Sequence, residues 1–173
     1  PKAAQKAQTS VSIERLRSLN ESLLQFPTDF HPNSKLLRAT EKRRHVLDDA
    51  DASSVDWASA EELALASILE DGIAIRMTGQ DSARGTFSQR HAVFYDAETN
   101  QSYTPLQSMS QANAAFEIYN TPVSEAGPVG FEIGYNIQAP ERLVLWEAQY
   151  GDFANNIQTV LDELLFSGRA KWG

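Results

Sequence analysis

Hydrophobic residues near the beginning of the chain recur at helical spacing. From Ser12 onward they come at three- and four-residue steps until Pro27 interrupts the run. These positions are Ile13, Leu16, Leu19, Leu23 and Phe26. Because the spacing places them on one face, it predicts an amphipathic helix. A second, mostly polar helix is expected from about Ser34 to Asp48.

An acidic run, DDADASS at 48–54, divides the chain into two parts. It is the predicted boundary between a short helical segment, residues 1–50, and a second part, residues 51–173. Asp56 is the predicted N-cap of the first helix after it, and Gly72 its C-terminal signal. The residues expected on the buried face of this helix are Trp57, Leu63, Leu65, Ile68 and Leu69.

Helix and strand patterns alternate in the rest of the chain. Extended runs occur at 73–77, 91–95, 116–120 and 143–146. One helix is expected from Ser124 to about Gln138. Another is expected from about Phe153 to Phe166, with Gly168 as its C-terminal signal. This order indicates an α/β fold in which a parallel sheet is flanked by helices. Such sheets bind ligands at the carboxyl ends of their strands, and Gln80, Glu125 and Tyr150 all fall near strand ends or helix starts.

Charge and composition argue against several classes of function. The net charge of -8 argues against nucleic acid as the main partner, because phosphate contacts need clustered Lys and Arg. The one basic cluster, 42–44, is interpreted as a solvated helix face. No apolar run approaches the ~18 residues of a membrane span. The lack of Cys excludes disulfides and thiol chemistry, and suits a bacterial cytosol or a mitochondrial matrix. The polar start without Met leads us to expect a piece of a longer protein.

Glu125 is the strongest candidate for chemistry. Ser124 is a good N-cap, which would place Glu125 in the first turn of a helix, where the macrodipole alone favours an acid. The small, apolar neighbours at 126–129 would also desolvate the carboxylate and raise its proton affinity. Tyr150 and Phe153 either belong to the core or show two aromatic faces to one cavity. The residues alone leave both interpretations open.

Other polar positions give weaker indications of function. Residues 79–85 form a glycine-flanked loop, which is interpreted as a plain turn although its backbone amides could approach a phosphate. His91 is either a base or a partly buried structural histidine. His31 and His45 are expected in solvent. No pair of His or carboxylate residues has metal-ligand spacing, so no metal ligand is predicted in this chain.

Four motifs in one order carry a resemblance to a known family. They read TGQDSARGTFSQRHAVFYD, SEAGPVGFEIGY, LVLWEAQYGDFANN and SGRAKWG. Over most of residues 50–173 they resemble the thiamine-diphosphate-dependent, decarboxylating component of 2-oxoglutarate dehydrogenase. The segment is similar to the transketolase-like pyrimidine-binding domain of that enzyme. The preceding FPTDFHPNSKLLRATEKRR resembles the helical linker before that domain.

The resemblance implies roles for the candidate residues. Glu125 corresponds to the glutamate that hydrogen-bonds the aminopyrimidine ring of the cofactor and promotes its imino tautomer. Tyr150 corresponds to the aromatic residue that packs on this ring, with Phe153 as a supporting wall. Gln80 lines the same cavity as a cofactor-binding residue, and His91 lies toward the substrate. A desolvated carboxyl at Glu125 would suit proton donation at neutral pH.

The resemblance also implies an enzyme and its partners. The family belongs to the tricarboxylic acid cycle and decarboxylates 2-oxoglutarate with thiamine diphosphate and Mg²⁺, whose ligands are expected outside this segment. The succinyl group then passes to a lipoyl group on a succinyltransferase component. The cofactor binds between subunits of a homodimer, so the isolated segment is expected to be inactive. The alternatives are a 2-oxoadipate-type homologue and a non-catalytic, pyrimidine-domain-like module retained for dimerisation.

Overall fold

A computed structural model describes residues 8–49, 55–122 and 124–172 of the chain, without the side chains of Asp152, Phe153 and Arg169. The boundary predicted at residue 50 therefore lies outside the described residues. Within them, no helix is long and apolar enough to cross a membrane.

Two helices begin the described chain, as the sequence predicts. Helix α1 spans Ile13–Leu23, and Ser12 caps it by accepting a hydrogen bond from the backbone N–H of Arg15. Helix α2 spans Ser34–Arg43, and turns follow it to residue 48, so the predicted end at Asp48 was too late. Arg43 is also not on a solvated face, because it forms an ion pair with the buried Glu62 of the next helix.

Helix α3, Trp57–Glu70, has both predicted terminal signals. Asp56 accepts a hydrogen bond of 2.7 Å from the backbone N–H of Ser59, and Gly72 ends the helix region with a φ of 83°. The prediction that Trp57 is buried was wrong, since its side chain is 93% exposed. Trp57 is the first helical residue, and the buried residues of α3 begin two positions later, at Ser59.

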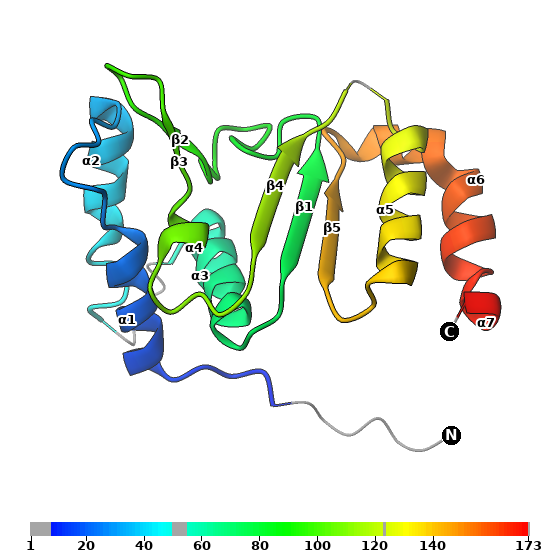
Figure 1. Ribbon diagram of the computed structural model, residues 1–173, viewed down its shortest axis with the longest axis horizontal. Helices are drawn as coiled ribbons and strands as arrows, with labels where there is room; N and C mark the ends of the chain where they lie inside the picture. Colours follow the sequence, from blue (N-terminus) through cyan, green and yellow to red (C-terminus); the bar gives the residue numbers. More distant parts are fainter. Residues whose placement is uncertain (1–7, 50–54, 123, 173) are drawn as a thin grey trace.

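The predicted parallel sheet is confirmed. Its strands are β1 (Ile75–Gly79), β4 (Phe116–Asn120) and β5 (Leu143–Glu147), in the order β4-β1-β5 within the described residues. Gly79 at the end of β1 is in register with Asn120 on one side and with Glu147 on the other. The three carboxyl ends therefore lie along one edge of the sheet, at the top of Figure 1.

The extended run at 91–95 does not join this sheet. Only β2, Phe94–Tyr95, is a strand, and it pairs antiparallel with β3, Ser102–Tyr103, ahead of the short helix α4, Pro105–Ser108. His91 has a φ of 47°, a left-handed backbone conformation that interrupts an extended chain.

A buried carboxylate fastens this small hairpin to the N-terminal segment. Asp96 is 3% exposed and accepts backbone N–H bonds from His31 at 2.6 Å, Glu98 at 2.8 Å and Thr99 at 2.7 Å. These bonds hold the pKa of Asp96 well below its usual range, since they favour the charged form more than burial disfavours it. The ring of His31 is 55% exposed and that of His45 74%, as predicted for both histidines.

Helix α5, Ala126–Gln138, begins one residue later than the sequence suggests. Glu125, not Ser124, stands at the N-cap position, and its side chain makes no capping hydrogen bond. The reason is a tight turn before the helix, in which the backbone N–H of Ser124 donates to the carbonyl of Pro122.

The C-terminal part is less regular than predicted. A 3₁₀ helix η1 (Gly151–Ile157), a short α6 (Gln158–Val160) and a π-helical stretch η2 (Leu161–Phe166) replace one continuous helix. After Gly168 the chain continues as α7, Arg169–Trp172, so this glycine separates two helices.

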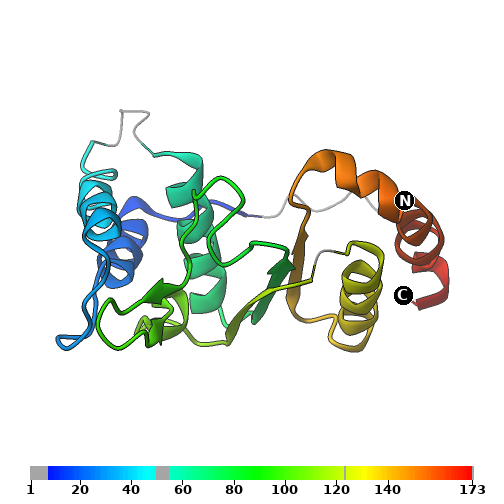
Figure 2. The ribbon, with the colours of Figure 1, turned by 90° about the horizontal axis from the view of Figure 1, so that it is seen from above.

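Helices cover both faces of the sheet. Figure 2 shows α3 on one side and α5 with the C-terminal helices on the other. The hydrophobic core lies on the α3 side and combines both parts of the chain; its buried members are Leu19, Leu23, Leu47, Leu63, Leu65, Ala66, Leu69, Ile75, Ala92, Leu106, Met109 and Phe116.

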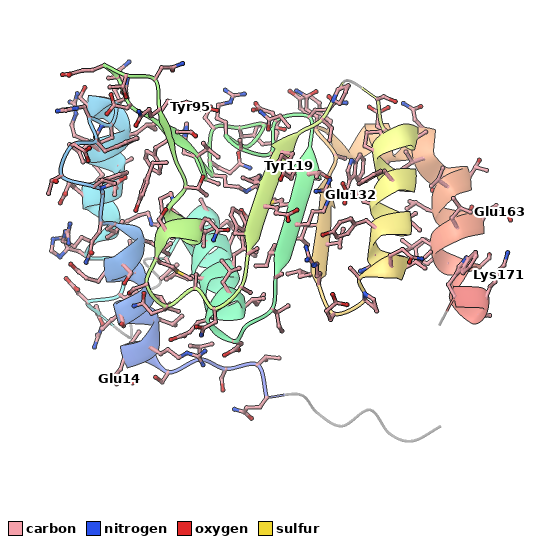
Figure 3. All side chains as sticks on the ribbon, viewed as in Figure 1. Glu14, Tyr95, Tyr119, Glu132, Glu163 and Lys171 are labelled. Atoms are coloured by element: carbon pink, nitrogen blue, oxygen red, sulfur yellow. The ribbon has the colours of Figure 1, made fainter. Side chains whose placement is uncertain are left out.

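An arginine connects the opposite face of the sheet to α5. Arg76 of β1 bonds to both oxygens of Glu132, at 2.8 to 3.2 Å, and to Glu117 at 3.2 Å. Its guanidinium also lies 4.9 Å from the centroid of the Tyr135 ring. Glu132 is 5% exposed, and Figure 3 shows it where α5 faces the sheet. A charged pair therefore adds to the contact between the sheet and α5 on this face.

Candidate functional site

The carboxyl edge of the sheet brings two of the predicted residues together. Gln80 directly follows β1, and Glu125 directly precedes α5. The Nε2 atom of Gln80 donates a hydrogen bond of 3.0 Å to Oε1 of Glu125. Both side chains are half-buried. The contact holds a carboxylate in a fixed place at the edge where parallel α/β sheets bind ligands.

Gly79 allows the strand ends at this edge to approach closely. A Cβ atom at Gly79 would lie 2.5 Å from the backbone carbonyl oxygen of Glu147 and 2.5 Å from Oγ of Ser82. Backbone atoms cannot give way as the end of a side chain can. Gly79 therefore permits the packing that sets Gln80 beside the end of β5.

Tyr150 follows β5 by three residues and is 50% exposed. Its ring meets that of Phe87 edge to face, with centroids 6.0 Å apart and an interplanar angle of 80°. Phe87 is itself 74% exposed, so two aromatic rings stand at the surface beside this edge. The sequence analysis missed Phe87, although it lies in the loop motif that carries the resemblance.

Trp146, within β5, does not join this pair in the described part of the structure. Trp146 lines an apolar cavity between α5, β5 and the C-terminal helices, on the other side of the sheet from α3. The side chain of Phe153 lies outside the described part of the structure, so its predicted position stays a prediction.

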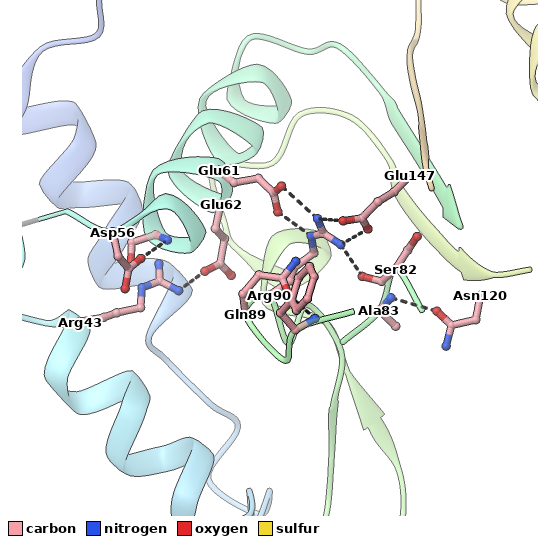
Figure 4. A network of polar contacts seen from close by, with 12 residues as sticks. Arg43, Asp56, Glu61, Glu62, Ser82, Ala83, Gln89, Arg90, Asn120 and Glu147 are labelled. Atoms are coloured by element: carbon pink, nitrogen blue, oxygen red, sulfur yellow. Dashed lines mark hydrogen bonds and ion pairs between the residues drawn. The ribbon is translucent and has the colours of Figure 1, made fainter. Parts of the chain in front are cut away.

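Arg90 forms the densest polar network near the site (Figure 4). Its side chain is 6% exposed and bonds to Glu61 of α3, to Glu147 of β5 and to the carbonyl oxygen of Ser82. Burial disfavours the charged guanidinium, but the hydrogen bonds with both carboxylates outweigh it and raise the pKa of Arg90. This arginine is therefore permanently charged.

The sequence analysis also missed Arg90 and its network. Its two acidic partners lie 29 and 57 positions away in the chain. No local pattern links residues at such distances, and only the folded arrangement of α3 and β5 brings them to one guanidinium.

His91 lies next to Arg90 and is half-buried. Burial is the main cause that lowers the pKa of His91 below its usual value, and the nearby charge of Arg84 acts in the same direction. The ring is therefore neutral near pH 7. Its backbone N–H donates to the carbonyl of Arg84 at 3.0 Å. None of its described contacts reaches Gln80 or Glu125, so its predicted place in the same cavity stays a prediction.

The described residues contain no group of three or more His, Cys, Asp or Glu side chains that could hold a metal ion.

The side chains of Gln80, Glu125 and Tyr150 suit a flat, nitrogen-containing ring. A half-buried carboxylate can bond a ring nitrogen, an amide can orient that carboxylate, and an exposed tyrosine can stack on a ring face.

These features define a parallel α/β domain with a candidate ligand site at the carboxyl edge of its sheet. Residues 53–173 match the family described as "Transketolase, pyrimidine binding domain", and the chain belongs to this family.

Bacterial relatives share high sequence identity with the chain. It is 55% identical over 165 residues to a protein of Geobacillus sp. (strain WCH70), covering 95% of the chain and 17% of the relative. It is 50% identical over 172 residues to a protein of Bacillus mycoides (strain KBAB4), and this match covers 99% of the chain and 18% of the relative. Both relatives are named "2-oxoglutarate dehydrogenase E1 component". The chain thus spans less than a fifth of the length of these relatives.

Proposed function

We propose that this chain is the pyrimidine-binding part of a thiamine-diphosphate-dependent 2-oxoglutarate dehydrogenase E1 component. The hydrogen bond between Gln80 and Glu125 carries the proposal, since it orients a carboxylate at the carboxyl edge of the sheet in a chain that belongs to a pyrimidine-binding family. The names of the relatives support 2-oxoglutarate as the substrate rather than the 2-oxoadipate alternative.

Each residue of the site has a chemical task in this proposal. Glu125 would offer its carboxyl group to a ring nitrogen of the cofactor and serve there as a general acid–base group. Gln80 fixes the orientation of that carboxyl through Oε1. Tyr150 offers an aromatic face to the pyrimidine, Phe153 supports it, and His91 lies toward the substrate. When bound, thiamine diphosphate supplies the electron sink for loss of carbon dioxide.

The metal ion, the diphosphate and the acceptor of the succinyl group would be bound by other parts of the protein or by its partners. We expect Mg²⁺ and the diphosphate to be held outside this chain, as the resemblance implies. We place the chain in a homodimer whose succinyl product passes to a lipoyl-bearing succinyltransferase. The bacterial origin of the relatives supports the cytosol rather than the mitochondrial matrix.

The non-catalytic alternative is a module retained for dimerisation only. Such a module has no need for a half-buried carboxylate oriented by an amide. The Gln80–Glu125 contact therefore favours the catalytic function.

A Glu125→Gln substitution in the full-length protein tests the proposed function. General acid–base catalysis contributes about 10²- to 10⁴-fold, so carbon dioxide release from 2-oxoglutarate should fall by at least about 100-fold. Glu163→Gln, an exposed position on η2 (Figure 3), is the matched control and should leave the rate unchanged. Circular dichroism confirms that both variants fold. Full activity in the Glu125→Gln variant would refute the role of Glu125.

A further inference from the structure

Arg90 lies where three separate segments meet. These segments are helix α3, the loop after β1 and the end of β5 (Figure 4). Its Nε and Nη2 atoms donate to the two carboxylate oxygens of Glu61, at 2.5 and 3.0 Å. Its Nη1 and Nη2 atoms donate to the two oxygens of Glu147, at 2.6 and 3.1 Å. Nη1 also donates to the carbonyl of Ser82 at 2.9 Å. All five N–H donors of the guanidinium are therefore used.

Stability alone is a weak explanation for such a network. Burying the guanidinium carries a large desolvation cost, while Glu61 and Glu147 keep 38% and 29% of their side chains exposed, where ion pairs contribute little to stability. What the network does provide is a fixed geometry, because the planar guanidinium binds both carboxylates in two-point contacts.

The network joins the two segments that carry the proposed cofactor residues. Ser82 lies two residues after Gln80, and Glu147 lies three residues before Tyr150. The loop is also fastened to β4, since the backbone N–H of Ala83 donates to Oδ1 of Asn120 at 3.0 Å. The loop after β1 is therefore fixed to β4 through Ala83, and Arg90 connects the same loop to the end of β5.

We propose that Arg90 is a positioning residue of the cofactor site. It sets the separation between the Gln80 segment and the Tyr150 segment, and thus the width of the opening that receives the pyrimidine ring. This inference rests on the proposed function of the chain. Arg90 acts through Glu147 and Ser82 and does not itself touch the cofactor.

An Arg90→Lys substitution in the full-length protein tests this role. Lysine keeps the charge but cannot make two-point contacts with two carboxylates and a carbonyl together. We expect the affinity for thiamine diphosphate, titrated with Mg²⁺ present and followed by intrinsic fluorescence, to fall at least about tenfold. Arg15→Lys is the matched control, because Arg15 also bridges two carboxylates, Glu70 and Asp71, but far from this edge. It should change the affinity less than about twofold.

A double-mutant cycle distinguishes positioning from general stability. If Arg90 acts by placing the Tyr150 segment, Tyr150→Ala should weaken cofactor binding much less in the Arg90→Lys background than in the wild type. Glu147→Gln provides a second, milder variant that keeps the Arg90–Glu61 pair, and it should show the same coupling.

The outcomes separate this inference from the proposed function. Unchanged cofactor affinity in Arg90→Lys and Glu147→Gln, or effects that simply add to that of Tyr150→Ala, overturns the positioning role and leaves the proposed function standing. A wild-type protein that neither binds thiamine diphosphate nor decarboxylates 2-oxoglutarate overturns both.

Discussion

Gln80 donates a hydrogen bond of 3.0 Å to Glu125, a residue 45 positions further along the chain. The contact exists because β1 and β4 are parallel neighbours, so that the residue after β1 and the turn after β4 meet at one edge. An acid at a helix start is common, but one oriented by an amide from another element is a more specific arrangement.

Gln80→Ala should reduce decarboxylation by the full-length protein about 10- to 100-fold. A hydrogen bond to a charged group contributes about 1.5–3 kcal/mol, and its loss leaves Glu125 free to turn away from the ring. Gln138→Ala, at an exposed position at the end of α5, should have no effect on the rate. Steady-state kinetics on both variants checks this, and equal rates would show that Gln80 does not orient Glu125.

Gly79→Ala should destabilise the protein by about 1–3 kcal/mol, because the added methyl group would overlap a backbone carbonyl. Gly134→Ala in α5 is the matched control. Its Cβ would meet nothing within 4 Å, so the change should stabilise the helix by about 0.4–1 kcal/mol. Urea unfolding of the purified chain measures both. A neutral Gly79→Ala variant would mean that the strand ends can move apart.

Glu132→Ala should cost about 3–5 kcal/mol of folding free energy, since it leaves the guanidinium of Arg76 short of its main partner. Replacing both residues, as Arg76→Met with Glu132→Leu, should recover much of that loss because the buried pair is gone and Glu117 keeps Arg142 at 3.6 Å. Thermal and urea unfolding of the two variants decide this. A double variant less stable than Glu132→Ala would contradict the explanation.

Asp96→Asn should lower stability at pH 7 and remove part of its pH dependence. The pKa of Asp96 is lower in the folded chain than the unfolded value of about 3.9. Its stabilising contribution is therefore fully present above pH ~4 and is lost as the pH falls through the folded pKa. The stability difference between wild type and Asp96→Asn should shrink from pH 7 to pH 3 in urea titrations. A constant difference would contradict this assignment.

The isolated chain should release no carbon dioxide from 2-oxoglutarate, even with thiamine diphosphate and Mg²⁺ added. Its described residues offer one side of a ring site and no metal cluster. A sensitive assay of carbon dioxide release with the purified chain is sufficient, and turnover above background would show that this segment holds a complete site.

Local signals in the sequence predicted much of the fold. Asp56 was identifiable as a cap because a carboxylate before an apolar periodicity satisfies free N–H groups. The strands of the parallel sheet followed from short apolar runs. The run at 91–95 was misleading, since its composition does not reveal the left-handed backbone of His91. Trp57 was misplaced because helical spacing does not show where the core ends.

The candidate site was predictable only in part. Glu125, Gln80 and Tyr150 followed from strand ends and from the resemblance, and the parallel topology explains why two of them meet. Arg90 was not predictable, because its environment depends on Glu61 and Glu147 from distant elements. The one-residue shift at Ser124 arises from a turn at Pro122 that helix signals do not encode.

The N-terminal segment and α3 share one hydrophobic core. The family match begins at residue 53, yet Leu19, Leu23 and Leu47 pack into the same core as α3. A protein cut at that point would present the leucines of α3 to water and tend to aggregate. Recombination between related enzymes would therefore have to take the two N-terminal helices and the sheet from the same parent sequence.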